Sequence, residues 1–109
     1  MKRDKETYLI DLRESCEHIE QFMGNISASE YGENFLVKRA VEREFEIIGE
    51  ILRRIRDEMP DLFEKIPSAR EIIGFRNVIA HGYDVVSDHT VYEIAKLDIP
   101  ELYKVLQNL

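Results

Sequence analysis

The sequence has one cysteine, no tryptophan, three prolines and no apolar run longer than three residues. Runs this short exclude a membrane-spanning helix, and the charged start MKRDKETY is unlike a secretory signal peptide. We therefore expect a cytoplasmic protein with no membrane contact. Cys16 has no second cysteine to pair with, and it falls on an apolar helical stripe, which predicts a buried thiol rather than a nucleophile or ligand.

The three histidines, His18, His81 and His89, are scattered along the chain and form no cluster with the cysteine. Metal sites need ligands that converge, so the sequence predicts no metal ion, and no cofactor motif is present. We place His18 and His89 on solvated helix surfaces.

The formal net charge of -7 argues against a protein that coats nucleic acid, because such binding depends on an excess of lysine and arginine. Nine of the 15 basic residues nevertheless lie between positions 38 and 76. This segment is either a solvated helix face of mixed charge or a local basic patch suited to a small phosphate-bearing target.

The 109 residues are typical of one domain, which we assign to residues 1–109. Apolar residues recur at helical spacing from about Asp4 to Met23 and from about Asn34 to Met59. GNISASEYGEN should be the break between these helices. Gly49 lies inside the second helix, where a glycine costs about 1 kcal/mol relative to alanine, so we expect a neighbouring helix to approach closely there.

Pro60 ends the second predicted helix, and PDLFEKIP should form a turn or a short helical piece. The capping-box pairs Ser68/Glu71 and Asp98/Glu101 predict helix starts near Ala69 and Asp98, with another helix starting near Ser87. No segment alternates as a strand does. The predicted fold class is therefore all-α, an up-and-down bundle of four to five helices.

The segment RNVIAHGYD, Arg76 to Asp84, closes the helix that begins near Ala69. Gly82 can take the left-handed conformation that ends a helix. Arg76 lies at the edge of the buried stripe, where it needs a partner or a wet cleft. Asn77 and His81 share one face, whereas Arg76 and His81 lie about 140° apart around the helix. A site that uses both Arg76 and His81 could be completed by a second subunit.

These side chains suit cleavage of a phosphodiester by an adjacent hydroxyl group. Histidine exchanges protons near neutral pH, and arginine offers a charged fork that fits phosphate oxygens, so the reaction needs no metal. The structural alternative is as simple: a histidine in a last turn stabilises the helix dipole, glycine caps it and tyrosine covers the end. From spacing alone, the capped helix end is the commoner case.

The segment RNVIAHGYD contains a motif of an arginine, four intervening residues, a histidine, one residue and a tyrosine, which here are Arg76, His81 and Tyr83, with Asn77 after the arginine. This motif resembles the signature of the HEPN superfamily, in its HepT-like branch of toxin ribonucleases. VEREFEIIGEILRRI, EIIGFRNVIAHGYDVV and LDIPELYKVL are similar to segments of that branch in the same order, so the resemblance covers most of the chain.

The resemblance implies a homodimer whose motif helices face each other across a shared cleft. It implies a metal-independent endoribonuclease that is the toxin of a toxin–antitoxin system, with Arg76 and His81 catalytic and Asn77 and Tyr83 supporting them. It further implies a cognate MntA-like nucleotidyltransferase antitoxin that transfers AMP from ATP to Tyr83. The alternative is a non-catalytic helical partner subunit of a small nucleotidyltransferase, and a third hypothesis is a purely structural bundle with His81 as a cap.

Overall fold

The structure is a computed structural model that describes residues 4–81 and 87–109, with residue 81 described by its backbone alone. All regular secondary structure in this part of the chain is helical, which confirms the predicted all-α class. Within these residues no helix is both long enough and apolar enough to cross a membrane.

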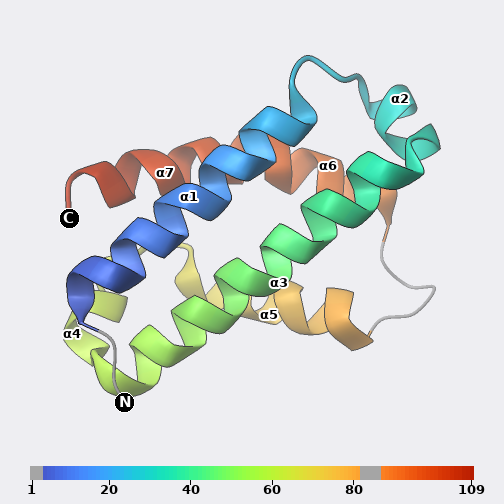
Figure 1. Cartoon of the computed structure of the whole chain (residues 1–109). Coiled ribbons are helices and arrows are strands. Elements are labelled where there is room, and N and C mark those ends of the chain that lie inside the picture. Colours follow the sequence, from blue (N-terminus) through green and yellow to red (C-terminus); the bar gives the residue numbers. More distant parts are fainter. Residues whose placement is uncertain (1–3, 82–86) are drawn as a thin grey trace.

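Two long helices, α1 (Lys5–Met23) and α3 (Phe35–Glu58), run side by side (Figure 1). Asp4 caps α1 by accepting a hydrogen bond from the Thr7 amide at 2.8 Å, and Gly24 ends the helix with φ of 49°. The apolar stripe predicted for α1 is buried as expected, and it comprises Leu9, Leu12, Cys16, Ile19 and Met23.

The connection between these helices is the predicted break in the helical pattern, and it contains the short helix α2 (Ala28–Glu33), which was not predicted. α2 forms because Ser27 and Glu30 make a capping box. The Ser27 hydroxyl accepts from the Glu30 amide at 3.1 Å, and the Glu30 carboxylate accepts from the Ser27 amide at 2.9 Å. These two bonds start a helix within a stretch rich in glycine and serine.

α3 contacts α1 on one side and α5 (Ala69–His81) on the other, as its wide apolar surface predicted. Its most buried residues are Val41, Phe45, Ile48, Leu52 and Ile55. The short helix α4 (Pro60–Phe63) follows and reverses the chain. α5 then returns along α3 (Figure 1).

The C-terminal part is one continuous helical rod made of α6 (Asp88–Glu93), the π-helical segment η1 (Ile94–Asp98) and α7 (Ile99–Gln107). The helix predicted to begin near Asp98 corresponds to α7, but the capping box predicted to start it is wrong. Asp98 has helical backbone angles, and its side chain makes no capping hydrogen bond. A spacing typical of a capping box therefore occurs here inside a helix.

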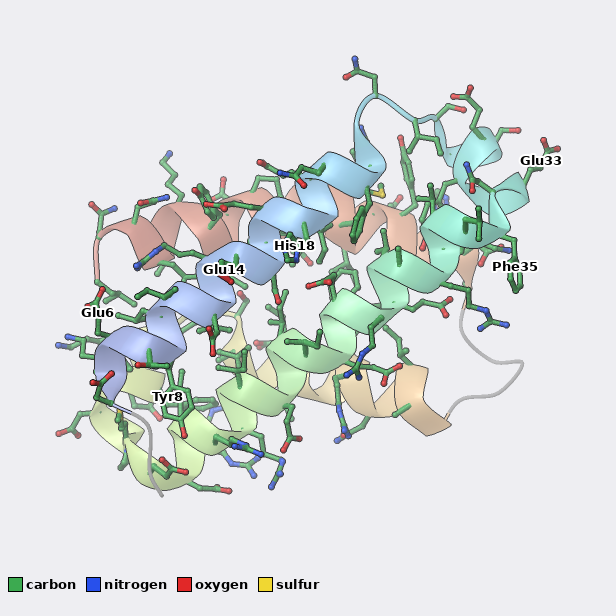
Figure 2. All side chains as sticks on the ribbon, in the orientation of Figure 1. Glu6, Tyr8, Glu14, His18, Glu33 and Phe35 are labelled. Atoms are coloured by element: carbon green, nitrogen blue, oxygen red, sulfur yellow. The ribbon has the colours of Figure 1, made fainter. Side chains whose placement is uncertain are left out.

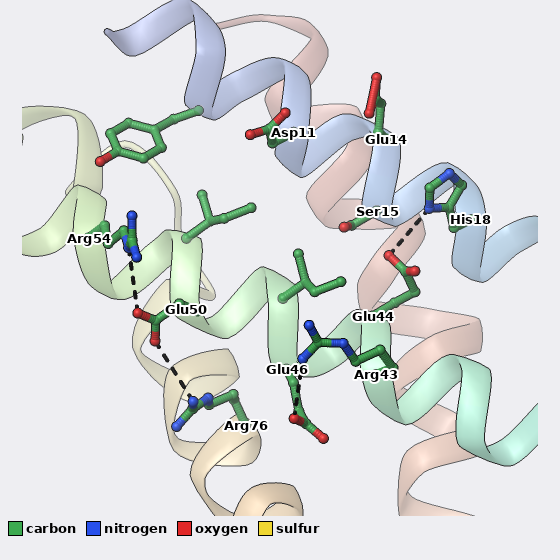
Figure 3. A pocket seen from close by; sticks show the side chains of 13 residues that line it. Asp11, Glu14, Ser15, His18, Arg43, Glu44, Glu46, Glu50, Arg54 and Arg76 are labelled. Atoms are coloured by element: carbon green, nitrogen blue, oxygen red, sulfur yellow. Dashed lines mark hydrogen bonds and ion pairs between the residues drawn. The ribbon is translucent and has the colours of Figure 1, made fainter. Parts of the chain in front are cut away.

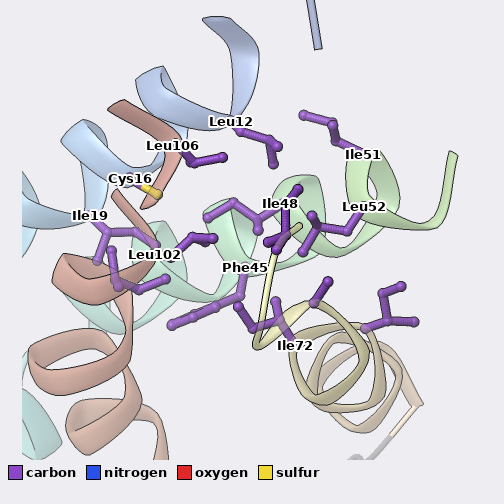
Figure 4. Packing of buried hydrophobic residues seen from close by; sticks show 14 of the residues in the cluster. Leu12, Cys16, Ile19, Phe45, Ile48, Ile51, Leu52, Ile72, Leu102 and Leu106 are labelled. Atoms are coloured by element: carbon purple, nitrogen blue, oxygen red, sulfur yellow. The ribbon is translucent and has the colours of Figure 1, made fainter. Parts of the chain in front are cut away.

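The rod is fastened to the first half of the chain by apolar packing and by hydrogen bonds. Leu102 and Leu106 of α7 lie close to α1 (Figure 4). The Tyr92 hydroxyl donates to the Ile26 carbonyl at 2.9 Å, and the Tyr103 hydroxyl donates to Glu17 at 2.7 Å. One hydrophobic cluster thus runs from α1 to α7.

Candidate active site

The site is built on α5, which carries the arginine and histidine of the motif. The Ser68 carbonyl accepts the first helical hydrogen bond from the Ile72 amide at 3.0 Å. Ile72 is buried, and the Phe75 ring meets the Phe45 ring of α3 edge-on, with centroids 5.1 Å apart. These contacts fix the rotation of α5 and bring Arg76 to the boundary with α3.

The aliphatic part of Arg76 lies against the backbone of α3 at Gly49. A Cβ atom placed on Gly49 would overlap the Arg76 Cβ and would lie 2.5 Å from the Arg76 Cγ. Only glycine leaves room for the arginine at this point. The expectation that a neighbouring helix approaches closely at Gly49 is confirmed, and the group that approaches is the motif arginine itself.

The guanidinium of Arg76 leaves this contact half-buried, with 27% of the side chain exposed. Its Nη1 donates to Asn77 Oδ1 at 3.2 Å, and its Nη2 lies 3.8 Å from Glu50 Oε2. Its Nε is buried and has no hydrogen-bond partner among the described residues. The structure therefore brings Arg76 and Asn77 together and adds Glu50, which no motif in the sequence indicates.

Glu50 is held in turn by two arginines of its own helix, Arg53 and Arg54, of which Figure 3 shows Arg54. Arg53 donates through Nη2 to Oε1 at 2.6 Å and through Nε to Oε2 at 3.2 Å, and Arg54 Nε lies 3.5 Å from Oε1. The hydrogen bond from Arg53 holds the pKa of the Glu50 carboxyl below its usual value, with smaller contributions from Arg54 and Arg76. Glu50 therefore stays ionised beside the motif arginine.

Arg76 and Glu50 belong to the wall of an open groove of about 470 Å³ that runs between α1 and α3. The groove is lined by side chains of both charges, including His18 and Glu44. His18 Nδ1 lies 3.4 Å from Glu44 Oε1, and the His18 side chain is about half exposed. It is therefore less solvated than the sequence predicted. His89 is 70% exposed and lies 2.8 Å from Glu93.

His81 is the last residue of α5, one turn beyond the exposed Asn77, and the structure describes its backbone only. Gly82 and Tyr83 lie outside the described residues, so the predicted cap and the predicted AMP acceptor are not placed. The last turn of α5 borders a second pocket of about 330 Å³, which is lined by Ile79 and Ala80 of α5 and by Phe35 of α3. Lys38 and Asp88 form an ion pair of 3.2 Å at this pocket.

Exposed apolar side chains gather near this end of the molecule. Phe35 is 61% exposed and Leu36 is 78% exposed at the start of α3, and Val78 of α5 is 45% exposed. The guanidinium of Arg39 lies 4.9 Å from the centre of the Phe35 ring. In the described part of the chain, no three histidine, cysteine or carboxylate side chains are arranged to hold a metal ion.

Comparison with known proteins gives consistent matches over most of the chain. The family model described as Ribonuclease HepT-like matches residues 12–109. The chain is 33% identical over 103 residues to a candidate RNase of Methanocaldococcus jannaschii, covering 94% of each chain. It is 34% identical over 102 residues to a candidate ribonuclease HepT of Thermococcus cleftensis, covering 94% of this chain and 92% of that one. No solved structure matches significantly.

Proposed function

The chain belongs to the HepT-like ribonuclease family, and on this basis we propose that it is a metal-independent endoribonuclease in which Arg76 and His81 act on RNA. The single observation that carries the proposal is the placement of Arg76. Its stem is fixed against α3, and its half-buried guanidinium makes no hydrogen bond to a carboxylate of the described residues, although Glu50 lies 3.8 Å from Nη2. An arginine held in this way suits a phosphate group.

The proposed reaction is attack of the ribose 2′-hydroxyl on the adjacent phosphorus. The 2′-oxygen loses its proton to a base, the bond from phosphorus to the 5′-oxygen breaks, and the 5′-oxygen receives a proton. The products are a 2′,3′-cyclic phosphate and a 5′-hydroxyl. His81 exchanges these protons, Arg76 stabilises the charge on the phosphate oxygens, and Asn77 orients Arg76 through its 3.2 Å hydrogen bond.

We propose that two copies of the chain form the working site. Both proton transfers occur if each copy contributes one His81, because one imidazole accepts a proton and the other donates one. The exposed Phe35, Leu36 and Val78, which lie near the end of α5 that carries His81, supply apolar surface for such a contact. A homodimer through the motif helices would also bring two Arg76 side chains to one cleft.

We further propose that the protein is the toxin of a toxin–antitoxin pair and that Tyr83 is its switch. A MntA-like nucleotidyltransferase antitoxin would transfer AMP from ATP to the Tyr83 hydroxyl, which attacks the α-phosphorus and releases pyrophosphate. Tyr83 follows the end of α5 by two residues. The added AMP would bring negative charge and bulk beside Arg76 and His81, and would repel and exclude RNA phosphate.

The test of the nuclease is cleavage of RNA by the purified protein in the presence of EDTA, with analysis of the product ends. Cyclic phosphate and 5′-hydroxyl ends are expected, and His81→Ala should remove them while leaving the fold and the oligomeric state unchanged. His89→Ala is the control, because His89 is exposed and pairs only with Glu93 among the described residues. Full cleavage by His81→Ala would overturn the assignment.

The test of the switch is the intact mass after incubation with the nucleotidyltransferase and ATP. A gain of AMP mass that is lost in Tyr83→Phe would support the proposal. Tight binding of the nucleotidyltransferase, without AMP transfer and without RNA cleavage by the free protein, would instead favour the non-catalytic partner subunit.

A further inference from the structure

We propose that Gly49 and Glu50 of α3 are positioning residues for Arg76: Gly49 sets where the arginine stem lies, and Glu50 sets the direction in which the guanidinium faces. The inference rests on the proposed function, in which Arg76 binds the scissile phosphate. The proposal extends the site from α5, which carries the motif, to α3.

Gly49 acts through the space that it leaves. The Cβ and Cγ of Arg76 occupy the volume that any side chain at position 49 would need. A glycine in the middle of a 24-residue helix is unfavourable by itself, so the close contact explains its place. Gly74 of α5 provides the contrast, because a Cβ there would meet nothing within 4 Å.

The contact at Gly49 leaves the end of Arg76 with limited freedom. Its Nε is buried and unpaired among the described residues, whereas its two Nη groups reach toward the surface. Asn77 takes a hydrogen bond from Nη1, and Glu50 attracts Nη2 from 3.8 Å. A separation of 3.8 Å is too long for a hydrogen bond, so Glu50 orients the guanidinium without occupying its donors.

Glu50 is suited to this role because Arg53 and Arg54 already hold it. The bidentate contact with Arg53 fixes the carboxylate, so its field acts on Arg76 from a defined point. Three arginines share the one Glu50 carboxylate, so its charge is divided among them and does not act on Arg76 alone. Glu50 therefore directs Arg76 without neutralising the site.

The first test observes Arg76 directly, without any need for ribonuclease activity. The Arg76 Nε–H signal in a ¹⁵N-labelled protein is identified by its loss in Arg76→Lys. We expect Glu50→Gln and Gly49→Ala to shift or broaden this signal, and Glu46→Gln and Gly74→Ala to leave it unchanged. Glu46 is a matched control: it is 33% exposed, compared with 31% for Glu50, and pairs with Arg43 at 3.6 Å on the same helix. An unchanged signal in Glu50→Gln overturns the proposal, even if Gly49→Ala fails to fold.

The second test is a double-mutant cycle on RNA cleavage. Glu50→Gln should lower kcat by about 10-fold with little change in KM, because a displaced guanidinium costs transition-state stabilisation. In the Arg76→Ala background the same change should have less than about a 2-fold effect, since nothing remains to be positioned. Equal losses in both backgrounds overturn the positioning role while the nuclease assignment stands. Full cleavage by Arg76→Ala would overturn the nuclease role of Arg76, and the proposal that rests on it.

Discussion

α3 packs against α1 on one side and α5 on the other, and the two contacts are built differently. On the α1 side, fully buried apolar residues such as Leu12 and Ile19 form the contact, and polar groups such as His18 and Glu44 lie at its edge. On the α5 side, a glycine and the stem of an arginine interrupt the apolar contact. The contact with α1 is an ordinary apolar core, whereas the contact with α5 has less apolar packing and holds a charged group at the surface.

In this small chain, the contact of α3 with α1 therefore serves mainly stability, and the contact of α3 with α5 serves the proposed function. The α1 contact depends on apolar side chains that fill the space between the two helices, and its charged groups lie at the periphery. The α5 contact requires a residue without a side chain opposite one with a long side chain. Four predictions test the comparison, in order of decreasing effect.

The largest effect is expected from the α5 side. His81→Ala and Arg76→Ala should each lower kcat/KM for RNA by roughly 10²-fold or more, the range for loss of a proton-transfer or charge-stabilising group. His18→Ala, on the α1 side, should leave kcat/KM within about 2-fold, which corresponds to roughly 0.4 kcal/mol. A large loss in His18→Ala would mean that the α1 wall of the groove also takes part in cleavage.

Leu12→Ala should have the next largest effect, and it should act on stability alone. Leu12 is fully buried in α1, and removing such a side chain costs about 2–5 kcal/mol of unfolding free energy. Denaturant unfolding measures this loss, and the activity of the molecules that remain folded should be unchanged. Leu97→Ala is the control, because Leu97 is 65% exposed and should change stability by less than about 0.5 kcal/mol.

The two helical glycines should respond in opposite directions to alanine. Gly49→Ala forces atoms into the space of Arg76 and should cost about 1–3 kcal/mol. Gly74→Ala adds a methyl group in open space and should stabilise the protein by about 0.4–1 kcal/mol. Thermal unfolding of both variants gives the sign directly. A stable Gly49→Ala would show that the contact between α3 and α5 yields more readily than its geometry indicates.

The smallest effect is expected from a polar contact on the α1 side. The Tyr8 hydroxyl donates to Glu58 Oε1 at 2.8 Å, where α1 begins and α3 ends (Figure 2). Tyr8→Phe should cost about 1 kcal/mol of unfolding free energy. Tyr103→Phe, which loses a more exposed bond to Glu17, should cost less. Cleavage by both variants should match the unchanged protein.

Much of the fold could be predicted because helical periodicity and helix caps depend on residues that are close in the sequence. The bounds of α1, α3 and α5, the burial of Cys16 and the close approach at Gly49 all followed from such signals. Two capping-box patterns show the limit. Ser27/Glu30 forms one and was overlooked, whereas Asp98/Glu101 forms none although it has the same spacing.

The site could be predicted only in part, because its geometry is tertiary. The motif placed Arg76 at the edge of the buried stripe, and the structure has it there, half-buried. Nothing in the local sequence links Glu50 to Arg76, since the two lie 26 positions apart and meet only when α5 packs on α3. The roles of His81 and Tyr83 stay predictions.

The fastening of the C-terminal rod has a consequence for how the protein is made. The bonds from Tyr92 to Ile26 and from Tyr103 to Glu17 join residues 66 and 86 positions apart. Contacts between such distant residues form late, and a chain leaving the ribosome presents α1, α3 and α5 before α7. The stripe of α1 that α7 covers stays open until then. We therefore expect a nascent chain to carry the whole motif before it has a stable fold on which the motif could act.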